Sequence, residues 1–273
     1  MSDTAELTDG DLRRIITIVY DQSGITLDTG KKALVSARLQ KRLRTLGLPS
    51  YSAYLAHLGR DRSGEELTRL LDAIATNHTR FFRESQHFDF LREQIVPALA
   101  DKAKGVGLDG WCAASATGEE PVTITITLLE AGVRRFRLLA SDLSTKALAA
   151  ARRGVYPLDS VKDVPQSLLR KYFERGLGEQ DGLARVATEI RQHVEYRALN
   201  LIAMDRLDRQ FDFIFCRNVM IYFDKRVQQR VVSMLEAHLA PGGHLFIAHS
   251  ESLNGISHGL TWIAPAVYQR SAA

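Results

Sequence analysis

The stretch WCAASATGEEP, residues 111–121, has the pattern of a buried strand, a tight turn and the first turn of a helix. Such a turn binds a pyrophosphate when several glycines let the backbone approach the phosphate oxygens at the helix N-terminus. Here Gly118 is the only glycine, and Glu119 and Glu120 begin the helix. Carboxylates at this place repel a phosphate and attract an ammonium group, so the turn predicts a ligand that carries a positive charge.

A further carboxylate follows at the end of the next apolar run, FRLLASD, where Asp142 is the last residue. An acidic residue at the end of this strand accepts hydrogen bonds from ribose hydroxyls in nucleotide-binding domains. A ribose without a diphosphate, next to a positive group, favours S-adenosylmethionine as the ligand. Taken alone, Glu119 and Glu120 are equally explained as residues that stabilise the helix dipole. Their combination with Asp142 favours the coenzyme.

The N-terminal part of the chain reads as helices only. Apolar residues such as Ile15 and Val19 share one helical face, and Ser63 precedes Glu66 with the spacing of a capping box. We therefore expect residues 1–76 to form a helical domain that contacts the substrate.

From about residue 107 the pattern changes to apolar runs that alternate with helical segments. The runs are GWCAA, FRLLASD, FDFIFCRN and GHLFIAHS, and helices are expected at 121–131, 144–152 and 224–239. Apolar runs of this kind are typical of parallel strands covered on both faces. The pattern predicts a doubly wound α/β domain over 77–273. We expect the PGG sequence at 241–243 to close the last helix and residues 260–270 to add one terminal strand.

Residues 155–192 interrupt this alternation. Gly176, Gly178 and Gly182 punctuate a turn, which an alternating run over 186–190 follows. We expect a small antiparallel β insert whose open edge accepts an extended peptide as an added strand. The same glycines are equally typical of a simple hairpin loop.

Composition agrees with a globular protein of one or two domains, with 273 residues, 45% hydrophobic and 25% charged. No apolar run approaches the roughly 20 residues of a membrane span, and the first residues lack the apolar core of a signal peptide, so a cytoplasmic location is expected. Cys112 and Cys216 lie in apolar runs and are expected to be buried. The eight histidines are scattered without metal-ligand spacing, so no metal site is expected.

Five motifs occur in a distinctive order. They are TNHTRFFRE (76–84), ATGEEP (116–121), LLASDLS (138–144), ALNL (198–201) and FDFIFCRNVMIYFDK (211–225). In order and spacing they resemble the chemotaxis receptor glutamate methyltransferases of the CheR family, with Val122 standing where that family often has an aromatic residue. The resemblance implies the doubly wound sheet of class I S-adenosylmethionine-dependent methyltransferases. It also implies S-adenosylmethionine as coenzyme, S-adenosylhomocysteine as product and glutamates on cytoplasmic receptor helices as substrate. It also implies the residues of the coenzyme site: Asn77, Thr79, Arg83, Glu120, Asp142, Asn200, Leu201, Asn218 and Val219.

Methyl transfer to a carboxylate needs no general base, because a glutamate with a pKa near 4.3 is ionised at neutral pH. The protein has to align the carboxylate with the methyl group and exclude water. We expect Arg83 to steer the substrate carboxylate and Tyr222 to shape the pocket near the sulfonium. A surface or interdomain salt bridge is the alternative role for Arg83.

The segment KKALVSARLQKRLR, residues 31–44, contains six basic residues and no acidic one. Lys31, Arg38 and Arg42 are expected on one side of a helix as a basic ridge that binds an acidic partner. A glutamate-rich receptor helix is one such partner. We expect the enzyme itself to be a monomer. Nucleic acid is the other, and it defines the alternative of a nucleic-acid methyltransferase with the same coenzyme. The run that ends at Cys216 lacks the Pro-Pro motif of adenine-modifying enzymes, which argues against the nucleic-acid alternative. A third alternative is an adaptor that binds receptors but no coenzyme, and the complete set of pocket residues argues against it.

Overall fold

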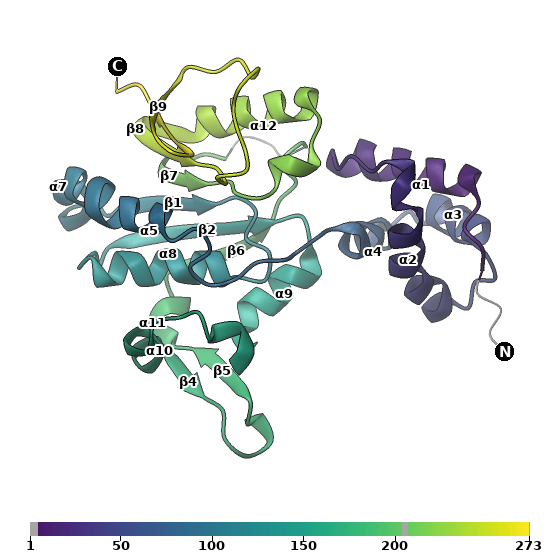
Figure 1. Cartoon of the computed structure of the whole chain (residues 1–273), viewed down its shortest axis with the longest axis horizontal. Helices are drawn as coiled ribbons and strands as arrows, with labels where there is room; N and C mark the ends of the chain where they lie inside the picture. The colour runs from purple at the N-terminus through teal and green to yellow at the C-terminus, as the bar shows by residue number, and fades with distance from the viewer. Residues whose placement is uncertain (1–4, 204–206, 273) are drawn as a thin grey trace.

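The computed structural model describes residues 5–203 and 207–272, and its centre is a seven-stranded sheet (Figure 1). The strands of this sheet are β1 (Leu108–Cys112), β2 (Phe136–Asp142), β6 (Val194–Ala198), β7 (Phe211–Phe215), β8 (Leu239–Phe246), β9 (Leu260–Ala264) and β10 (Val267–Arg270). In the order β6-β2-β1-β7-β8-β10-β9, the first five run parallel and the last two form an antiparallel hairpin. The strand order reverses beside β1, and open α/β sheets bind ligands at the carboxyl ends of the strands at such a point.

Helices cover both faces of this sheet. They are α5 (Gln86–Phe90), the π-helical turn η2 (Leu91–Ile95), α6 (Val96–Ala98), α7 (Ala100–Lys104), α8 (Glu119–Glu130), α9 (Thr145–Arg153) and α12 (Lys225–His238). On one face, Phe213 and Phe215 of β7 belong to the same buried cluster as Ile124 of α8. On the other face, Ile214 belongs to a cluster with Val231 of α12. Neighbouring strand residues therefore enter two different cores, which explains the continuous apolar runs and confirms the doubly wound sheet.

A helical unit precedes the sheet along the chain. It consists of α1 (Asp9–Ser23), the short turn η1 (Thr29–Lys31), α2 (Lys32–Leu46), α3 (Tyr51–Arg60) and α4 (Glu65–Ile74). Residues such as Ile15 form a separate buried core within this unit. Tyr20 donates a hydrogen bond of 2.6 Å to Asp224, and Ile25 forms an isolated bridge with Phe223, so the unit contacts the carboxyl side of the sheet.

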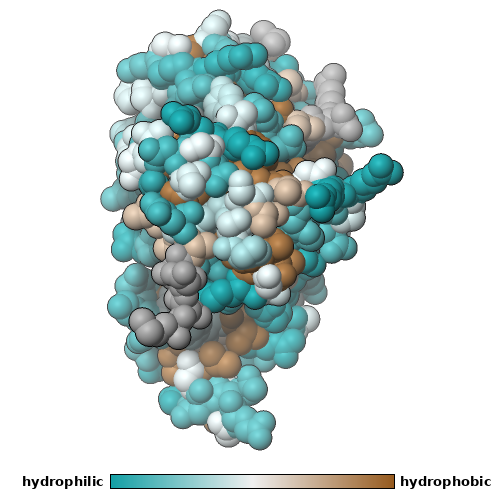
Figure 2. All heavy atoms as spheres, turned by 90° about the vertical axis from the view of Figure 1, so that its right-hand side faces the viewer, coloured by the Kyte–Doolittle hydropathy of each residue, from teal (hydrophilic) through white to brown (hydrophobic). Residues whose placement is uncertain are grey.

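The end of the molecule that the helical unit presents is mainly hydrophilic, with smaller hydrophobic patches between the polar side chains (Figure 2). Across the described part of the chain, no helix combines the length and the apolar character needed to cross a membrane.

A small three-stranded antiparallel sheet projects from the main body (Figure 1). Its elements are β3 (Val155–Pro157), η3 (Leu158–Val161), α10 (Gln166–Tyr172), β4 (Phe173–Arg175), η4 (Gly178–Gln180), β5 (Leu183–Val186) and α11 (Thr188–Arg191). The strand order is β3-β5-β4. The alternating run expected over 186–190 is wrong, because the strand ends at Val186 and a helical turn follows. Val186 and Ile190 are buried while Thr188 is exposed, and a spacing of four residues suits one face of a helix.

The start of α4 also differs from the expected capping box. Gly64 takes the N-cap position with φ of 73°, and the carboxylate of Asp61 accepts the N–H of Glu66 at 2.7 Å. Ser63 Oγ contacts the N–H of Glu65 instead. Asp61, two residues before the expected cap Ser63, therefore caps this helix, because the positive φ of Gly64 turns the chain back toward Asp61.

Three features of the main sheet differ from the sequence analysis. The PGG sequence at 241–243 lies within β8, which follows α12 directly, and the pairing with β7 is irregular there. Residues 260–270 form the hairpin of β9 and β10, because Ala266 turns the chain with φ of 59°. The edge strand β6 was missed because its residues are exposed or half-buried, so it carries no apolar run.

Candidate active site

The carboxyl ends of β1, β2 and β7 meet the helical unit around a cavity of about 470 Å³. A cavity of this size suits a small organic ligand. The coenzyme-site residues implied by the family resemblance and the expected pocket residue Tyr222 line this cavity: Asn77, Thr79, Arg83, Glu120, Asp142, Asn200, Leu201, Asn218, Val219 and Tyr222. The fold thus brings together five motifs that are far apart in the sequence.

The turn after β1 needs its single glycine for packing. Gly118 has φ of 100°, and a Cβ atom there would lie 2.8 Å from Ala151 Cβ and from Tyr156 Oη. A side chain would therefore clash with α9 and with the β insert, while its backbone angle also favours glycine. Ala116 has φ of 46°, and its N–H donates to Asp142, which supports this unusual backbone. The glycine thus serves a tight turn that carries side chains at its other positions.

Asp142 is held in place by two backbone amides. Its Oδ2 accepts the N–H of Ala116 and its Oδ1 accepts the N–H of Ser144, each at 2.8 Å. Burial raises the pKa of Asp142, and the hydrogen bonds from the two amides act in the opposite direction. A carboxylate has about four acceptor positions. Asp142 is therefore a fixed acceptor that lines the cavity with capacity for further donors.

Arg217 is a site residue that the sequence interpretation missed. Its side chain is fully buried, and it donates to Glu120 Oε2 at 2.6 Å and to the carbonyl of Arg83 at 2.6 Å. It also pairs with Glu84 at 3.0 Å. Glu84 lies behind the cavity lining, and the two carboxylates and one guanidinium together leave a net charge of −1, so this side of the cavity still favours a positive ligand. The available signal was a single arginine at the end of the apolar run FDFIFC.

The second oxygen of Glu120 accepts a hydrogen bond from the thiol of Cys112 at 3.3 Å. Burial raises the pKa of the Cys112 thiol, so the thiol keeps the proton that it donates. Both cysteines are free and buried, as expected. Glu119 was expected beside Glu120 at the ligand, but it does not line the cavity and accepts from Thr117 Oγ1 at 2.6 Å. Consecutive residues of a helix point about 100° apart, so only one of the two faces the cavity.

The loop after β7 is shaped by Glu251, which the sequence gave no reason to single out. Asn218 in this loop has φ of 58°. The carboxylate of Glu251 accepts backbone N–H groups from Asn218 at 3.1 Å, Met220 at 2.9 Å and Ala248 at 2.8 Å. Burial raises the pKa of Glu251. This carboxylate thus fixes the loop that brings Asn218 and Tyr222 to the cavity.

Two family models match this chain. The all-alpha domain of CheR methyltransferase matches residues 10–75, and the SAM binding domain of CheR methyltransferase matches residues 77–266. The chain belongs to the CheR methyltransferase family. It is 41% identical over 268 residues to chemotaxis protein methyltransferase 2 of Pseudomonas aeruginosa, and the aligned region covers 94% of this chain and 92% of that relative. It is 38% identical over 275 residues to the chemotaxis protein methyltransferase of Salmonella typhimurium, with 99% and 93% covered. The resemblance found in the sequence is confirmed, and so is S-adenosylmethionine as the coenzyme.

The basic ridge expected on this CheR-family chain is smaller than its sequence indicates. Lys31 and Arg38 line the mouth of the cavity, whereas Arg42 does not. Arg42 forms a two-point ion pair with Glu66, at 3.1 Å through Nε and 2.6 Å through Nη2. The carboxylate of Glu66 is only 3% exposed, and a buried carboxylate needs a counter-ion, so Arg42 is not a free surface cation.

Arg38 is also partly engaged within the helical unit. Its guanidinium donates to the carbonyl of Ile74 and, at 3.3 Å, to the carbonyl of Ala75. It contacts Thr76 Oγ1 at 3.2 Å. These contacts attach α2 to the C-terminal end of α4, where the negative end of the helix dipole favours a cation. Of the three residues of the expected ridge, Lys31 is therefore the one that lines the cavity without a side-chain contact, among the described residues, that holds the helical unit together.

The glycines of the insert lie away from the cavity and serve the hairpin between β4 and β5. Gly178 and Gly182 have φ of 59° and 84°, and a Cβ atom on Gly176 would lie 2.0 Å from the carbonyl oxygen of Gln180. Each of these glycines is therefore explained by the geometry of the loop. Leu177 in the same loop is 82% exposed, which gives the insert an apolar tip.

Proposed function

We propose that this chain transfers the methyl group of S-adenosylmethionine to glutamate side chains on the cytoplasmic helices of chemotaxis receptors. The observation that carries the proposal is the cavity at the carboxyl edge of the sheet, which the fixed Asp142 and the paired Glu120 line together with the basic Lys31 of η1 and Arg38 of α2. Relatives with 41% and 38% identity carry the name chemotaxis protein methyltransferase, which supports the same substrate class.

The residues of the cavity suit the coenzyme. Asp142 is held by two amides as an acceptor for ribose hydroxyls, and the net charge of −1 on Glu84, Glu120 and Arg217 suits the ammonium group. The remaining proposed contacts come from the chain before α5 and from the loops after β6 and β7: Asn77, Thr79, Asn200, Leu201, Asn218 and Val219. When bound, the coenzyme supplies a methyl group activated on a sulfonium.

The protein's own task is to orient and to exclude water. A substrate glutamate is ionised at neutral pH, so no side chain has to remove a proton. Correct orientation supplies on the order of 7–11 kcal/mol in comparable reactions. We assign Arg83, whose guanidinium donates to the carbonyl of His78 at 3.2 Å, to steering the substrate carboxylate. Tyr222 is assigned to shaping the wall next to the sulfonium.

The mouth of the cavity suits an acidic, amphipathic helix. Lys31 and Arg38 stand there beside two apolar side chains that are unusually exposed, Leu34 at 40% and Ile221 at 52%. Lys31, Leu34 and Arg38 follow one another at spacings of three and four residues, so they share one side of α2 and its start. A receptor helix would place a glutamate at the cavity and its apolar positions against Leu34 and Ile221.

Lys31→Glu tests this docking mode. We expect slower receptor methylation with an unchanged Kd for the coenzyme, and the loss should shrink with added salt because exposed charges are screened over about 8 Å at physiological ionic strength. Wild-type methylation rates at low salt would remove Lys31 from the substrate surface.

We further propose that the insert binds a C-terminal tail peptide of the receptor. In the strand order β3-β5-β4 both outer strands have one unpaired edge, and an open edge accepts an extended peptide as an added strand. The exposed Leu177 stands at the end of β4, and tethering of this kind raises the local substrate concentration to roughly millimolar. Titration of receptor tail peptides should shift amide signals within residues 155–192. Unmoved signals, together with full methylation of tail-deleted receptors, would leave the insert with a structural role only.

The decisive experiment for the main proposal compares two acceptors. The purified chain is incubated with methyl-labelled coenzyme and either the cytoplasmic part of a chemotaxis receptor or nucleic acid. We expect label in the receptor as a base-labile ester that releases methanol. Label in RNA or DNA would instead establish a nucleic-acid methyltransferase.

A further inference from the structure

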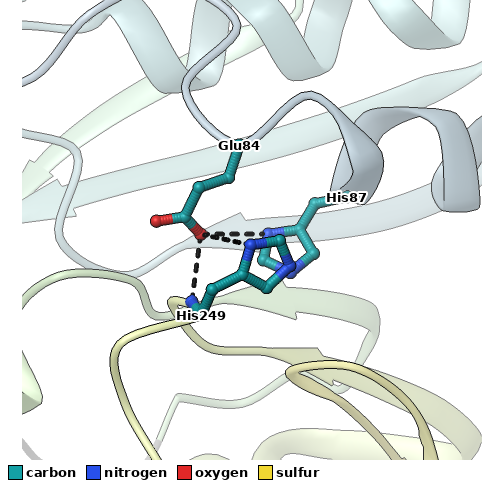
Figure 3. Close-up of side chains that lie close together, drawn as sticks. All are labelled: Glu84, His87 and His249. Atoms are coloured by element: carbon teal, nitrogen blue, oxygen red, sulfur yellow. Dashed lines mark hydrogen bonds and ion pairs between the residues drawn. The ribbon is translucent and has the colours of Figure 1, made fainter.

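Glu84, His87 and His249 form a cluster next to the coenzyme cavity without lining it (Figure 3). The Nδ1 atoms of both histidines face the same oxygen of Glu84, at 3.7 Å for His87 and 3.9 Å for His249. One candidate ligand atom from each residue lies within 4.8 Å of the other two. Two imidazoles and a carboxylate are a donor set that binds zinc and related divalent ions.

His87 supplies an independent observation that points to a ligand. Its side chain is only 2% exposed, and its ring nitrogens make no hydrogen bond of full geometry to a described residue, with only weaker contacts to Glu84 and to the backbone of Pro265. Native structures seldom leave a buried polar atom without a partner, and an ion or water at the site is a common explanation. The unpaired Nδ1 of His87 faces the centre of the cluster (Figure 3).

The cluster can be reached from the surface. The side chain of His249 is 38% exposed and borders a surface hollow that also includes Trp262 and Tyr268. An ion can therefore arrive through this hollow without passing through the coenzyme cavity.

The contact between Glu84 and Arg217 leaves room for an ion. Oε2 of Glu84 is 3.0 Å from Arg217 and accepts the backbone N–H of His249 at 3.1 Å. Both of these donors occupy Oε2, and each carboxylate oxygen has about two acceptor positions, so an ion that binds while Arg217 stays in place uses Oε1, the other oxygen of Glu84. The charges of the half-buried Glu84 and of the buried Glu120 and Arg217 sum to −1, so an ion at Glu84 offsets a net negative charge, although Arg217 itself repels it.

We propose that Glu84, His87 and His249 bind a divalent transition-metal ion of the zinc class. The separation of these residues in the sequence concealed the site, because Glu84 and His87 lie around the start of α5 and His249 follows β8. Since Glu84 also pairs with Arg217, which holds Glu120, a bound ion adds positive charge behind the coenzyme wall. The ion therefore weakens coenzyme binding, and the coenzyme weakens ion binding by the same factor. This coupling, unlike the metal site itself, rests on the proposed function.

The test is a calorimetric titration of the metal-stripped full chain with zinc chloride. We expect one ion per chain for the wild type. His249→Ala removes a direct ligand and should weaken zinc binding by at least about 10- to 100-fold, which is the loss seen when a residue that only hydrogen-bonds a metal ligand is removed. Because His249 is partly exposed, this variant should keep the wild-type circular dichroism and melting temperature. His57→Ala, at an exposed position of α3, is the matched control and should bind zinc like the wild type.

Absence of zinc binding by the wild type, or equal binding by His249→Ala, would overturn the proposal. Coupling is measured separately as the affinity for S-adenosylhomocysteine with and without zinc. A zinc-dependent loss in the wild type that is absent in His249→Ala supports the coupling, and an unchanged affinity refutes it. A chain that binds zinc but no coenzyme would contradict the proposed function and leave the metal site standing.

Discussion

Replacing Asp142 by alanine tests the coenzyme site at its best-defined group. The carboxylate accepts the amides of Ala116 and Ser144 at 2.8 Å each, which aims it into the cavity as the proposed partner of the ribose. Loss of hydrogen bonds to a charged group costs about 1.5–3 kcal/mol. This free energy corresponds to a rise in Kd of about 10- to 150-fold. We expect a rise of this size for S-adenosylhomocysteine, measured by isothermal titration calorimetry at fixed salt and temperature.

The same substitution leaves the N–H of Ala116 without its acceptor, so a lower melting temperature is also expected. Asp159→Ala removes an exposed carboxylate at η3 and serves as the matched control, with wild-type affinity and stability. If Asp142→Ala keeps the wild-type circular dichroism and also the wild-type Kd, Asp142 has no contact with the coenzyme and the reasoning is refuted.

Other consequences concern stability and pH. Arg217→Met should lower the free energy of unfolding in urea by about 3–5 kcal/mol, because it leaves buried carboxylates without a counter-ion; an unchanged midpoint would contradict the buried ion pairs. Arg42→Ala should lower the free energy of unfolding by about 1.5–3 kcal/mol, because Glu66 loses its two-point ion pair and keeps the longer contact to Arg69 at 3.8 Å, while the Kd for the coenzyme stays the same. A changed Kd with wild-type stability would argue for a direct role of Arg42 in the site. Burial raises the pKa of Asp142, so protonation removes the anionic acceptor at a higher pH than for an ordinary aspartate. Coenzyme affinity should therefore fall on acidification from above the usual aspartate range, and Asp142→Asn should flatten that part of the pH profile.

Local patterns were sufficient to predict the parts of the site that a single segment carries. The apolar run before Asp142 and the turn at Gly118 predicted a strand end and a helix start, and both are present in the structure. The helix expected over 224–239 is present as α12, and the side chain of Asp224 caps it by accepting the N–H of Val227 at 2.8 Å. Burial patterns and helix caps are short-range features, so one sequence contains them.

Partners that meet only in the folded chain were not predictable in this way. Arg42 looked like a surface cation because nothing near it in sequence is acidic, whereas Glu66 reaches it from another helix. Glu251 accepts amides from a loop about thirty residues earlier in the chain, and its role depends on backbone geometry. The cluster at His249 was missed for the same reason. Long-range pairing of polar groups depends on how the chain folds in space, so the hydrophobic periodicity of the sequence does not predict it.

The most direct measurement of the central claim is the location of the transferred methyl group. The purified chain, S-adenosylmethionine and the cytoplasmic part of a cognate chemotaxis receptor are incubated together, and the receptor peptides are sequenced by fragmentation mass spectrometry. We expect a methyl ester on the γ-carboxyl group of glutamates in helical segments, formed about 10- to 150-fold more slowly when Asp142→Ala replaces the wild type at limiting coenzyme. A methyl group on any other kind of side chain, or an unmodified receptor with a chain that binds the coenzyme, would contradict the claim.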